Sequence, residues 1–251
     1  MTITQRAIAL SVQQVEALNS LISEMRPPLD PPGRPQCALF LTIAEQFDAT
    51  VCLARANLLS HGAVHVRSMM EAAADLYMLG IADDHVRRMQ YEQVSGEVRF
   101  YERMLESHSL PSFDREPVTS RLNLCRERRA PLHAEFKSNW LGEADKFAAA
   151  QMPEFTSMYT LLCGFVHNDL TALSLRHQSN GPGMTIRAGL QDEIAYVILQ
   201  IAHHALVRTA QRIGEAAYFP DGHFEHHYGE MERLYEKFVE MRPRREPGSK
   251  A

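Results

Sequence analysis

Hydrophobic residues recur every three or four positions along most of the chain. This period is typical of amphipathic α-helices that bury one face and leave the other in water. The segments with this pattern are residues 4–25, 36–60, 84–107, 117–129, 140–150, 153–168, 192–218 and 224–241. The pattern therefore predicts an all-α protein, a helical bundle with about seven to nine helices.

The stretch from Gly62 to Gly80 differs from the other segments because it is apolar on nearly every side. Such a helix is normally buried, so this one is predicted to lie at the centre of the bundle. It nevertheless carries Arg67 and Glu71 one helical turn apart, with Asp75 a turn further on. An Arg–Glu pair in this order contributes only tenths of a kcal/mol. If buried, the pair needs further partners from other helices.

Glycine, proline and asparagine mark where the segments end. The pair His61-Gly62 is predicted to end the helix over 36–60. Near residues 173–188, Ser-Asn-Gly-Pro-Gly separates two short alternating runs, which fits either one short β-hairpin or an ordered loop. With no repeat or linker, the sequence predicts a single all-helical domain over 1–241, with its core at about 36–218. Residues 242–251 are predicted to form a flexible tail.

Composition narrows the class of protein. Hydrophobic residues make up 45% of the chain and charged residues 23%, as in folded globular proteins. The net charge of −5 argues against a general nucleic-acid coat but leaves room for a local basic groove. The first residues lack a signal-peptide pattern, and charges interrupt the best apolar run, 62–80. Four cysteines without close pairing indicate buried free thiols. We expect a cytoplasmic protein without membrane association.

Histidines give two further candidate sites. His167 ends an apolar segment beside Asn168, where a cap or a core residue is the simpler interpretation and a proton-transfer role the alternative. The segment HFEHHYGE places histidines and Glu230 at spacings that share a helical face, but a complete metal site needs more ligands. It is interpreted as a solvated helix start, and the sequence predicts neither a metal site nor a cofactor.

Three short motifs resemble a known family. The segment R-S-M-M-E-A at 67–72, NWLGEADKFAAA at 139–150 and YTLLCGFVH at 159–167 together resemble an uncharacterised bacterial domain-of-unknown-function family. That family is distantly similar to the HEPN (higher eukaryotes and prokaryotes nucleotide-binding) superfamily. The resemblance covers roughly residues 36–210. It implies an all-helical homodimer with Arg67, Glu71, Tyr159 and His167 close together, and many HEPN proteins are RNA-cleaving toxins or antiviral effectors.

The chain departs from the HEPN ribonuclease motif, in which an arginine precedes a histidine by a gap of four to six residues. Leu161, Leu162 and Cys163 stand upstream of His167, and none is arginine. Arg126 and Arg128 precede His133 at the required gap, but Pro131 lies between them and makes a regular helical face doubtful. Arg67 can supply the missing cation from another helix.

Two functions remain open. In the first, Arg67, Glu71 and His167 are catalytic, Tyr159 and Asn168 bind substrate, and the site binds or cleaves RNA or a nucleotide in a toxin-type or defence system. In the second, the same residues form a buried structural network inside a non-catalytic dimeric scaffold or partner-binding module.

Overall fold

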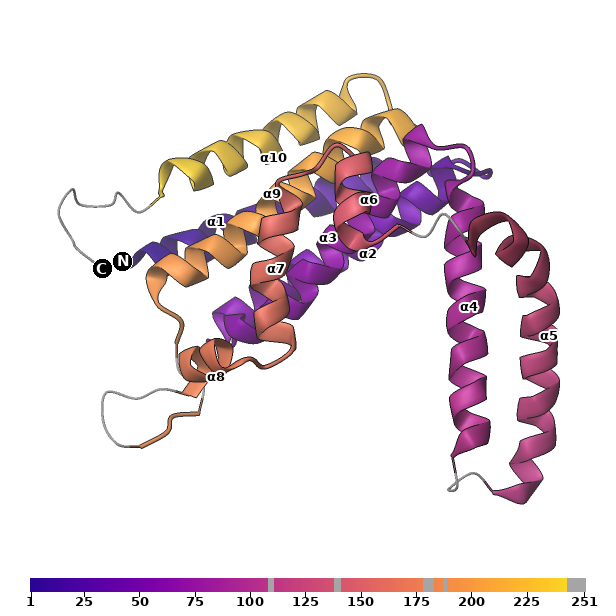
Figure 1. The fold of residues 1–251 in the computed structure, drawn as a ribbon. Helices are drawn as coiled ribbons and strands as arrows, with labels where there is room; N and C mark the ends of the chain where they lie inside the picture. Colours follow the sequence, from indigo (N-terminus) through magenta and orange to yellow (C-terminus); the bar gives the residue numbers. More distant parts are fainter. Residues whose placement is uncertain (108–110, 138–140, 178–182, 187–188, 243–251) are drawn as a thin grey trace. The chain divides into compact units, whose positions relative to one another are not determined.

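The structure is a computed structural model that describes residues 1–107, 111–137, 141–177, 183–186 and 189–242. These residues contain ten helices and no strand, which confirms the all-α class and slightly exceeds the predicted number of helices. In chain order (Figure 1) the helices are α1 (Ile3–Glu24), α2 (Gly33–Arg55), α3 (Leu59–Ile81), α4 (His85–Glu106), α5 (Ser112–Phe136), α6 (Glu143–Ala149), α7 (Phe155–Val166), α8 (Leu170–His177), α9 (Asp192–Ala216) and α10 (His223–Glu240).

The chain divides into two compact units, Met1–Gly80 with Glu143–Ala251, and Ile81–Gly142. A single domain over 1–241 stays a prediction. In the smaller unit α4 and α5 form a helical hairpin around a small core of Val94, Val98, Leu122 and Cys125. Helix α5 is longer than predicted.

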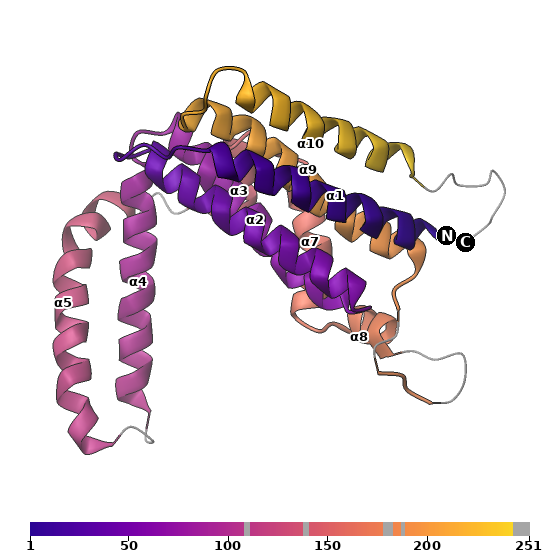
Figure 2. The same ribbon diagram turned by 180° about the vertical axis from the view of Figure 1, so that it is seen from behind.

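In the larger unit, α1, α9 and α10 lie side by side in both views (Figures 1 and 2). Helix α2 packs against α1 and α9. The ends of α1 are fixed to α9: Thr4 Oγ1 donates to Asp192 Oδ1 over 2.6 Å, and the backbones of Arg26 and Tyr218 exchange hydrogen bonds of 2.8 and 3.0 Å. These contacts hold α1 and α9 in register.

Helices α2 and α3 run antiparallel, as predicted. Gln36 near the start of α2 donates to the carbonyl of Leu76 near the end of α3 over 3.1 Å, and Gln46 contacts His65 further along both helices. Most of α3 is buried, with fully covered residues that include Val66, Met69, Met70, Ala73 and Leu76. The prediction of a central helix is therefore confirmed.

The hairpin predicted near 173–188 is wrong over its first part, because α8 occupies Leu170–His177. Asp169 Oδ1 accepts the backbone N–H of Ala172 over 2.7 Å, which caps the first turn of this helix. Residues 178–182 and 187–188, the rest of the expected turn, lie outside the described residues. So do Trp140 and residues 243–251 of the predicted tail.

Among the described residues, α2 is the one helix long and apolar enough to span a membrane, rather than the 62–80 segment. It packs against α1 and α9 and buries Phe40, Ile43 and Phe47, as core helices of this length also do. The four cysteines are free, but only Cys37 and Cys125 are buried: Cys52 is exposed and Cys163 is half-buried, so the prediction of four buried thiols is wrong for these two. A cytoplasmic location stays a prediction.

Candidate functional site

Three polar side chains from two helices meet beside the core of the larger unit. Arg67 and Glu71 stand one turn apart on α3, and Tyr159 comes from α7. Arg67 Nη2 donates to Tyr159 Oη over 2.6 Å, and Tyr159 Oη donates to Glu71 Oε1 over 2.7 Å. Arg67 Nη2 also lies 3.2 Å from Glu71 Oε1. We call these three residues the α3–α7 cluster. The partner that the sequence requires from another helix is Tyr159.

Aromatic contacts fix the cluster's orientation. The Arg67 guanidinium carbon lies 4.8 Å from the centre of the Tyr159 ring, a cation–π distance. Phe147 on α6 packs edge-on against the same ring at 5.4 Å. Because Phe147 is fully buried, it anchors the tyrosine ring to the core. The cation is therefore held in one direction.

The cluster changes the acid–base behaviour of its members. Burial lowers the pKa of Arg67, but the hydrogen bond to Tyr159 and the Glu71 charge outweigh burial, and the pKa lies above its usual value. Burial and the hydrogen bond to Glu71 raise the pKa of Tyr159 to about 12, against the opposing effect of Arg67. Arg67 therefore stays charged and Tyr159 stays neutral at physiological pH.

The cluster is neither fully buried nor a free surface pair. The side chain of Arg67 is 25% exposed and that of Glu71 is 39% exposed. Arg67 Nε is nevertheless shielded from solvent and makes no hydrogen bond within the described part of the chain. The Arg67 side chain is thus held by its neighbours and is still partly open to solvent.

His167 lies at the far end of α7 rather than in the cluster. It is exposed, and its backbone N–H closes the helix by donating to the carbonyl of Cys163 over 2.9 Å. Eight residues separate it from Tyr159, which is about 12 Å along a helix axis. No hydrogen bond or ion pair joins His167 to Arg67, Glu71 or Tyr159.

Asn168 ends α7, as predicted. Its backbone has a positive φ of 54°, a conformation that asparagine tolerates better than most residues. Its Oδ1 accepts a hydrogen bond from Arg176 Nη1 on α8. The side chain that the sequence assigns to substrate binding thus holds a buried arginine in the structure, and substrate binding by Asn168 stays a prediction.

Arg176 is the functional candidate that sequence reasoning missed. Only 6% of it is exposed, and its Nη2 donates to the carbonyls of Ser60 and Phe165 over 3.0 and 2.9 Å. It lines a cavity of about 270 Å³ whose walls are Asn57, Leu58, Ser60, His61, Arg176, His177 and Ile186, named here the Arg176 pocket. Because the sequence suggested a hairpin at this position, nothing in it predicted a buried cation.

Two other sets of ionic contacts join α3 and α9 to neighbouring segments of the chain. Lys146 on α6 is buried and lies 3.5 Å from Asp75, the third charge of the α3 stripe. On α9, His204 and Arg208 both approach Glu154, at 3.3 and 3.8 Å. The hydrophobic periodicity of α3 and α9 predicted that Asp75, His204 and Arg208 lie on helices. Their partners, Lys146 and Glu154, lie too far away in the chain for the sequence to predict the contacts.

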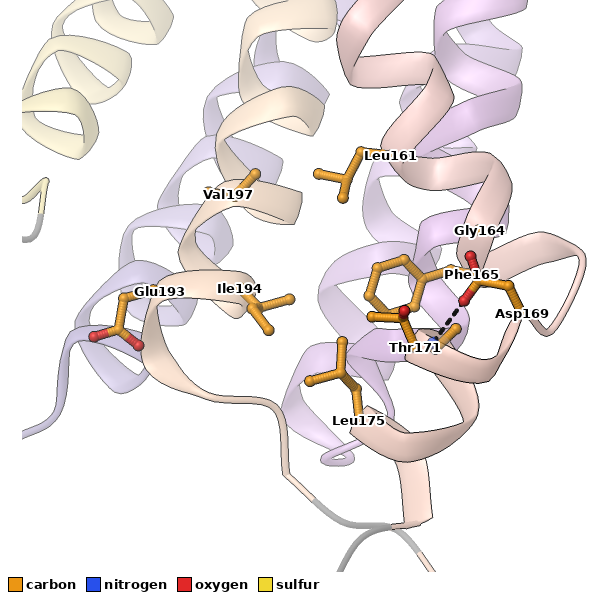
Figure 3. A pocket seen from close by; sticks show the side chains of 10 residues that line it. Leu161, Gly164, Phe165, Asp169, Thr171, Leu175, Glu193, Ile194 and Val197 are labelled. Atoms are coloured by element: carbon orange, nitrogen blue, oxygen red, sulfur yellow. Dashed lines mark hydrogen bonds between the residues drawn. The ribbon is translucent and has the colours of Figure 1, made fainter. Parts of the chain in front are cut away.

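A second cavity, of about 320 Å³, lies between α7, α8 and α9 (Figure 3). Leu161, Phe165, Leu175 and Ile194 are among its apolar lining residues. In Figure 3 the Glu193 side chain points away from this space, while Asp169 is hydrogen-bonded to the start of α8. We call this space the apolar cavity.

The alternative arginine–histidine pair lies in the smaller unit. Helix α5 continues through Pro131, so the expectation that this proline breaks the helical face is wrong. The side chains are nevertheless engaged by α4: Arg126 pairs with Glu102 at 2.8 Å, and His133 Nδ1 lies 2.8 Å from Tyr91 Oη. These contacts hold the hairpin together.

No group of three or more His, Cys, Asp or Glu side chains in the described part of the chain is placed to hold a metal ion. In the histidine-rich start of α10, His223 lies 3.7 Å from Glu24, and Glu230 pairs with Arg233. These contacts match the interpretation of a solvated helix start.

One comparison with known proteins gives a match. The pattern that defines a family of unknown function, DUF5677, matches residues 35–184. This range contains the α3–α7 cluster, His167 and every lining residue of the Arg176 pocket except Ile186. Neither a curated protein nor a solved structure matches the chain.

Proposed function

The chain belongs to the DUF5677 family, whose function is unknown, and we propose that it binds RNA or a nucleotide through the phosphates at the α3–α7 cluster. The observation that carries the proposal is the geometry of Arg67. Its Nη2 lies 2.6 Å from Tyr159 Oη, and its side chain is 25% exposed. A fixed, permanently charged guanidinium on a partly exposed side chain is the group proteins favour for phosphate recognition.

Pre-organisation supports a binding role over a purely structural one. Only Nη2 of the guanidinium donates to the other members of the cluster. Because these neighbours already order the Arg67 side chain, binding a phosphate costs little further side-chain entropy. Glu71 competes with a phosphate for the same cation, so the carboxylate is expected to weaken ligand binding while orienting the arginine.

Binding is favoured over cleavage at this position. A general acid or base must come within about 3 Å of the proton that it transfers. His167 stands about 12 Å along α7 from Tyr159, so a phosphate held by Arg67 alone is out of its reach. A strand of RNA can span that distance, whereas a single phosphate cannot. The distant HEPN resemblance is compatible with an RNA ligand.

Fluorescence anisotropy with a labelled single-stranded RNA tests the proposal. Arg67→Gln is expected to weaken binding by about tenfold or more, and to lower the dependence of affinity on salt. The matched control is Arg233→Gln, which also breaks an intrahelical Arg–Glu pair but on α10. Glu71→Gln is expected to strengthen binding. Thermal unfolding verifies that each variant is folded. Equal affinities for Arg67→Gln and Arg233→Gln, or no binding by the unaltered protein, would refute the proposal.

A second candidate is a dimeric scaffold, and the apolar cavity favours it. Leu161 and Val197 at the cavity are 46% and 36% exposed, and Leu173 of α8 is 38% exposed. Clustered apolar exposure of this kind marks contact surfaces. Here a second copy of the chain would cover α7, α8 and α9. Sedimentation equilibrium checks the mass: Leu161→Asp is expected to convert dimers to monomers, and a monomeric unaltered protein would exclude this candidate.

A further inference from the structure

The Arg176 pocket contains a buried positive charge that pairs with no carboxylate among the described residues. The oxygens that accept hydrogen bonds from Arg176 are the carbonyls of Ser60 and Phe165 and the side-chain amide of Asn168. All three are neutral. Arg176 Nε is buried and makes no hydrogen bond in the described part of the chain. A buried guanidinium costs several kcal/mol of desolvation unless an anion compensates it.

Two histidines line the same pocket. His61 lies near the start of α3 and is exposed, while His177 ends α8 and is half-buried. Burial lowers the pKa of His61, and the charges of Arg176 and His177 lower it further. The direction of these effects means that the groups around His61 repel its protonated form. The pocket is electropositive, and its seven lining residues include no carboxylate.

We propose that the Arg176 pocket is a binding site for a phosphate-type oxyanion, either inorganic phosphate or a small phosphomonoester. The Arg176 guanidinium supplies a fixed positive charge and two histidine rings can supply N–H donors, which suits a phosphate with several acceptor oxygens better than a carboxylate with two. A volume of about 270 Å³ is near the lower end of the range for ligand pockets, about 300 Å³ and upward, and therefore favours a small ligand.

The pocket is built by elements that come together only in the fold. Asn57, Ser60 and His61 belong to the turn from α2 to α3 and the first turn of α3, whereas Arg176 and His177 end α8. Arg176 itself joins these parts, because it donates to Ser60 on α3 and to Asn168 after α7. An anion bound there would therefore stabilise the contact between α8 and α3.

Isothermal titration calorimetry of the full chain with inorganic phosphate, at constant ionic strength with chloride, tests the inference. One phosphate per chain is expected at the Arg176 pocket.

Exposed His61 gives the cleanest variant, because substituting Arg176 removes hydrogen bonds that hold three segments. His61→Glu is expected to weaken phosphate binding by about tenfold or more, and His226→Glu, an exposed histidine on α10, to leave binding unchanged. Acetate and adenosine monophosphate are titrated in parallel. Tight binding of adenosine monophosphate that His61→Glu weakens would identify a phosphomonoester site at this pocket, and such binding of inorganic phosphate alone a free-phosphate site.

Three results would overturn the inference: no phosphate binding at millimolar concentration, unchanged affinity in His61→Glu, or acetate that binds as tightly as phosphate. The inference does not rest on the proposed RNA function. RNA binding is expected to be weakened in Arg67→Gln and unchanged in His61→Glu, whereas the part of the phosphate titration that His61→Glu removes is expected to remain in Arg67→Gln, so the two proposals can fail separately.

Discussion

Tyr159 Oη donates a hydrogen bond of 2.7 Å to Oε1 of Glu71, and it accepts one of 2.6 Å from Nη2 of Arg67. One phenol therefore bridges the positive and the negative charge of an adjacent helix. The direct Arg67–Glu71 contact is longer, 3.2 Å, and its Arg-before-Glu order is the weaker one for a helix. The geometry of the cluster thus depends on the neutral phenol more than on the ion pair.

Removing the phenol oxygen is expected to destabilise the protein. Tyr159→Phe keeps the ring against Arg67 and Phe147 but loses two hydrogen bonds to charged groups, at a cost of about 1–2 kcal/mol after allowance for partial exposure. Chemical denaturation followed by circular dichroism measures the change. Tyr228→Phe is the control, because its hydroxyl makes only a 3.4 Å contact with Glu232 on the same helix. Equal losses for both variants would mean that the bridge contributes nothing.

The same bridge predicts a loss of stability at alkaline pH. The pKa of Tyr159 is raised to about 12 from a usual value of 10.0, so the folded state favours the neutral phenol. Its contribution is fully present below pH 10 and is lost as the pH rises toward 12. The free-energy difference between the unaltered protein and Tyr159→Phe is therefore expected to shrink across this window. A constant difference would contradict the assignment, and other tyrosines cancel in the comparison.

Much of this architecture was predictable because a long amphipathic helix has hydrophobic residues every three or four positions in its sequence. The buried face of α9 and the all-round apolar character of α3 are local patterns that need no knowledge of the fold. Even the need for a partner beside Arg67 and Glu71 follows from desolvation. The identity of that partner, Tyr159, came from a family resemblance, since no local rule connects residues separated by almost a hundred positions.

Local rules failed where tertiary contacts decide. Helix α8 is short, and the side chains that fix it are Asp169 at its start and Arg176, which reaches across to α3. Between α2 and α3 the left-handed residue is Asn57, with φ of 59°, so Gly62 was free to lie inside α3. Pro131 remains within α5, where packing on α4 compensates for the lost hydrogen bond.

Gly33, at the start of α2, is expected to tolerate no side chain. A Cβ added there would lie 2.4 Å from Pro28 Cγ and 2.9 Å from the backbone oxygen of Ala216. Because the second neighbour is backbone, Gly33→Ala is expected to cost about 1–3 kcal/mol. Gly229→Ala on α10 meets nothing within 4 Å and should stabilise the protein by up to about 1 kcal/mol. Thermal unfolding measures the change in stability of both variants. A Gly33→Ala variant more stable than the unaltered protein would show that the neighbours of Gly33 move easily.

His203 is completely buried on α9. Its Nε2 lies 2.9 Å from Ser11 Oγ, and its ring packs against Phe47 and Phe238 at 5.0 and 4.4 Å. Burial lowers its pKa to about 3 from a usual value of 6.5. The unfolded chain therefore binds a proton below pH 6.5 that the folded protein does not take up. Stability from this histidine is present above pH 6.5 and is lost as the pH falls toward 3.

Between about pH 6.5 and pH 5, where carboxylates have hardly begun to titrate, this one proton contributes a slope that rises from about 0.7 to about 1.4 kcal/mol per pH unit. His203→Gln keeps a donor for Ser11 and removes the titration, so it should lower stability at neutral pH but flatten the slope. His226→Gln, on the exposed face of α10, should keep the slope. Chemical denaturation at several pH values separates the two effects. A slope that survives in His203→Gln would mean that another group takes up the proton, because a packing defect alone does not depend on pH.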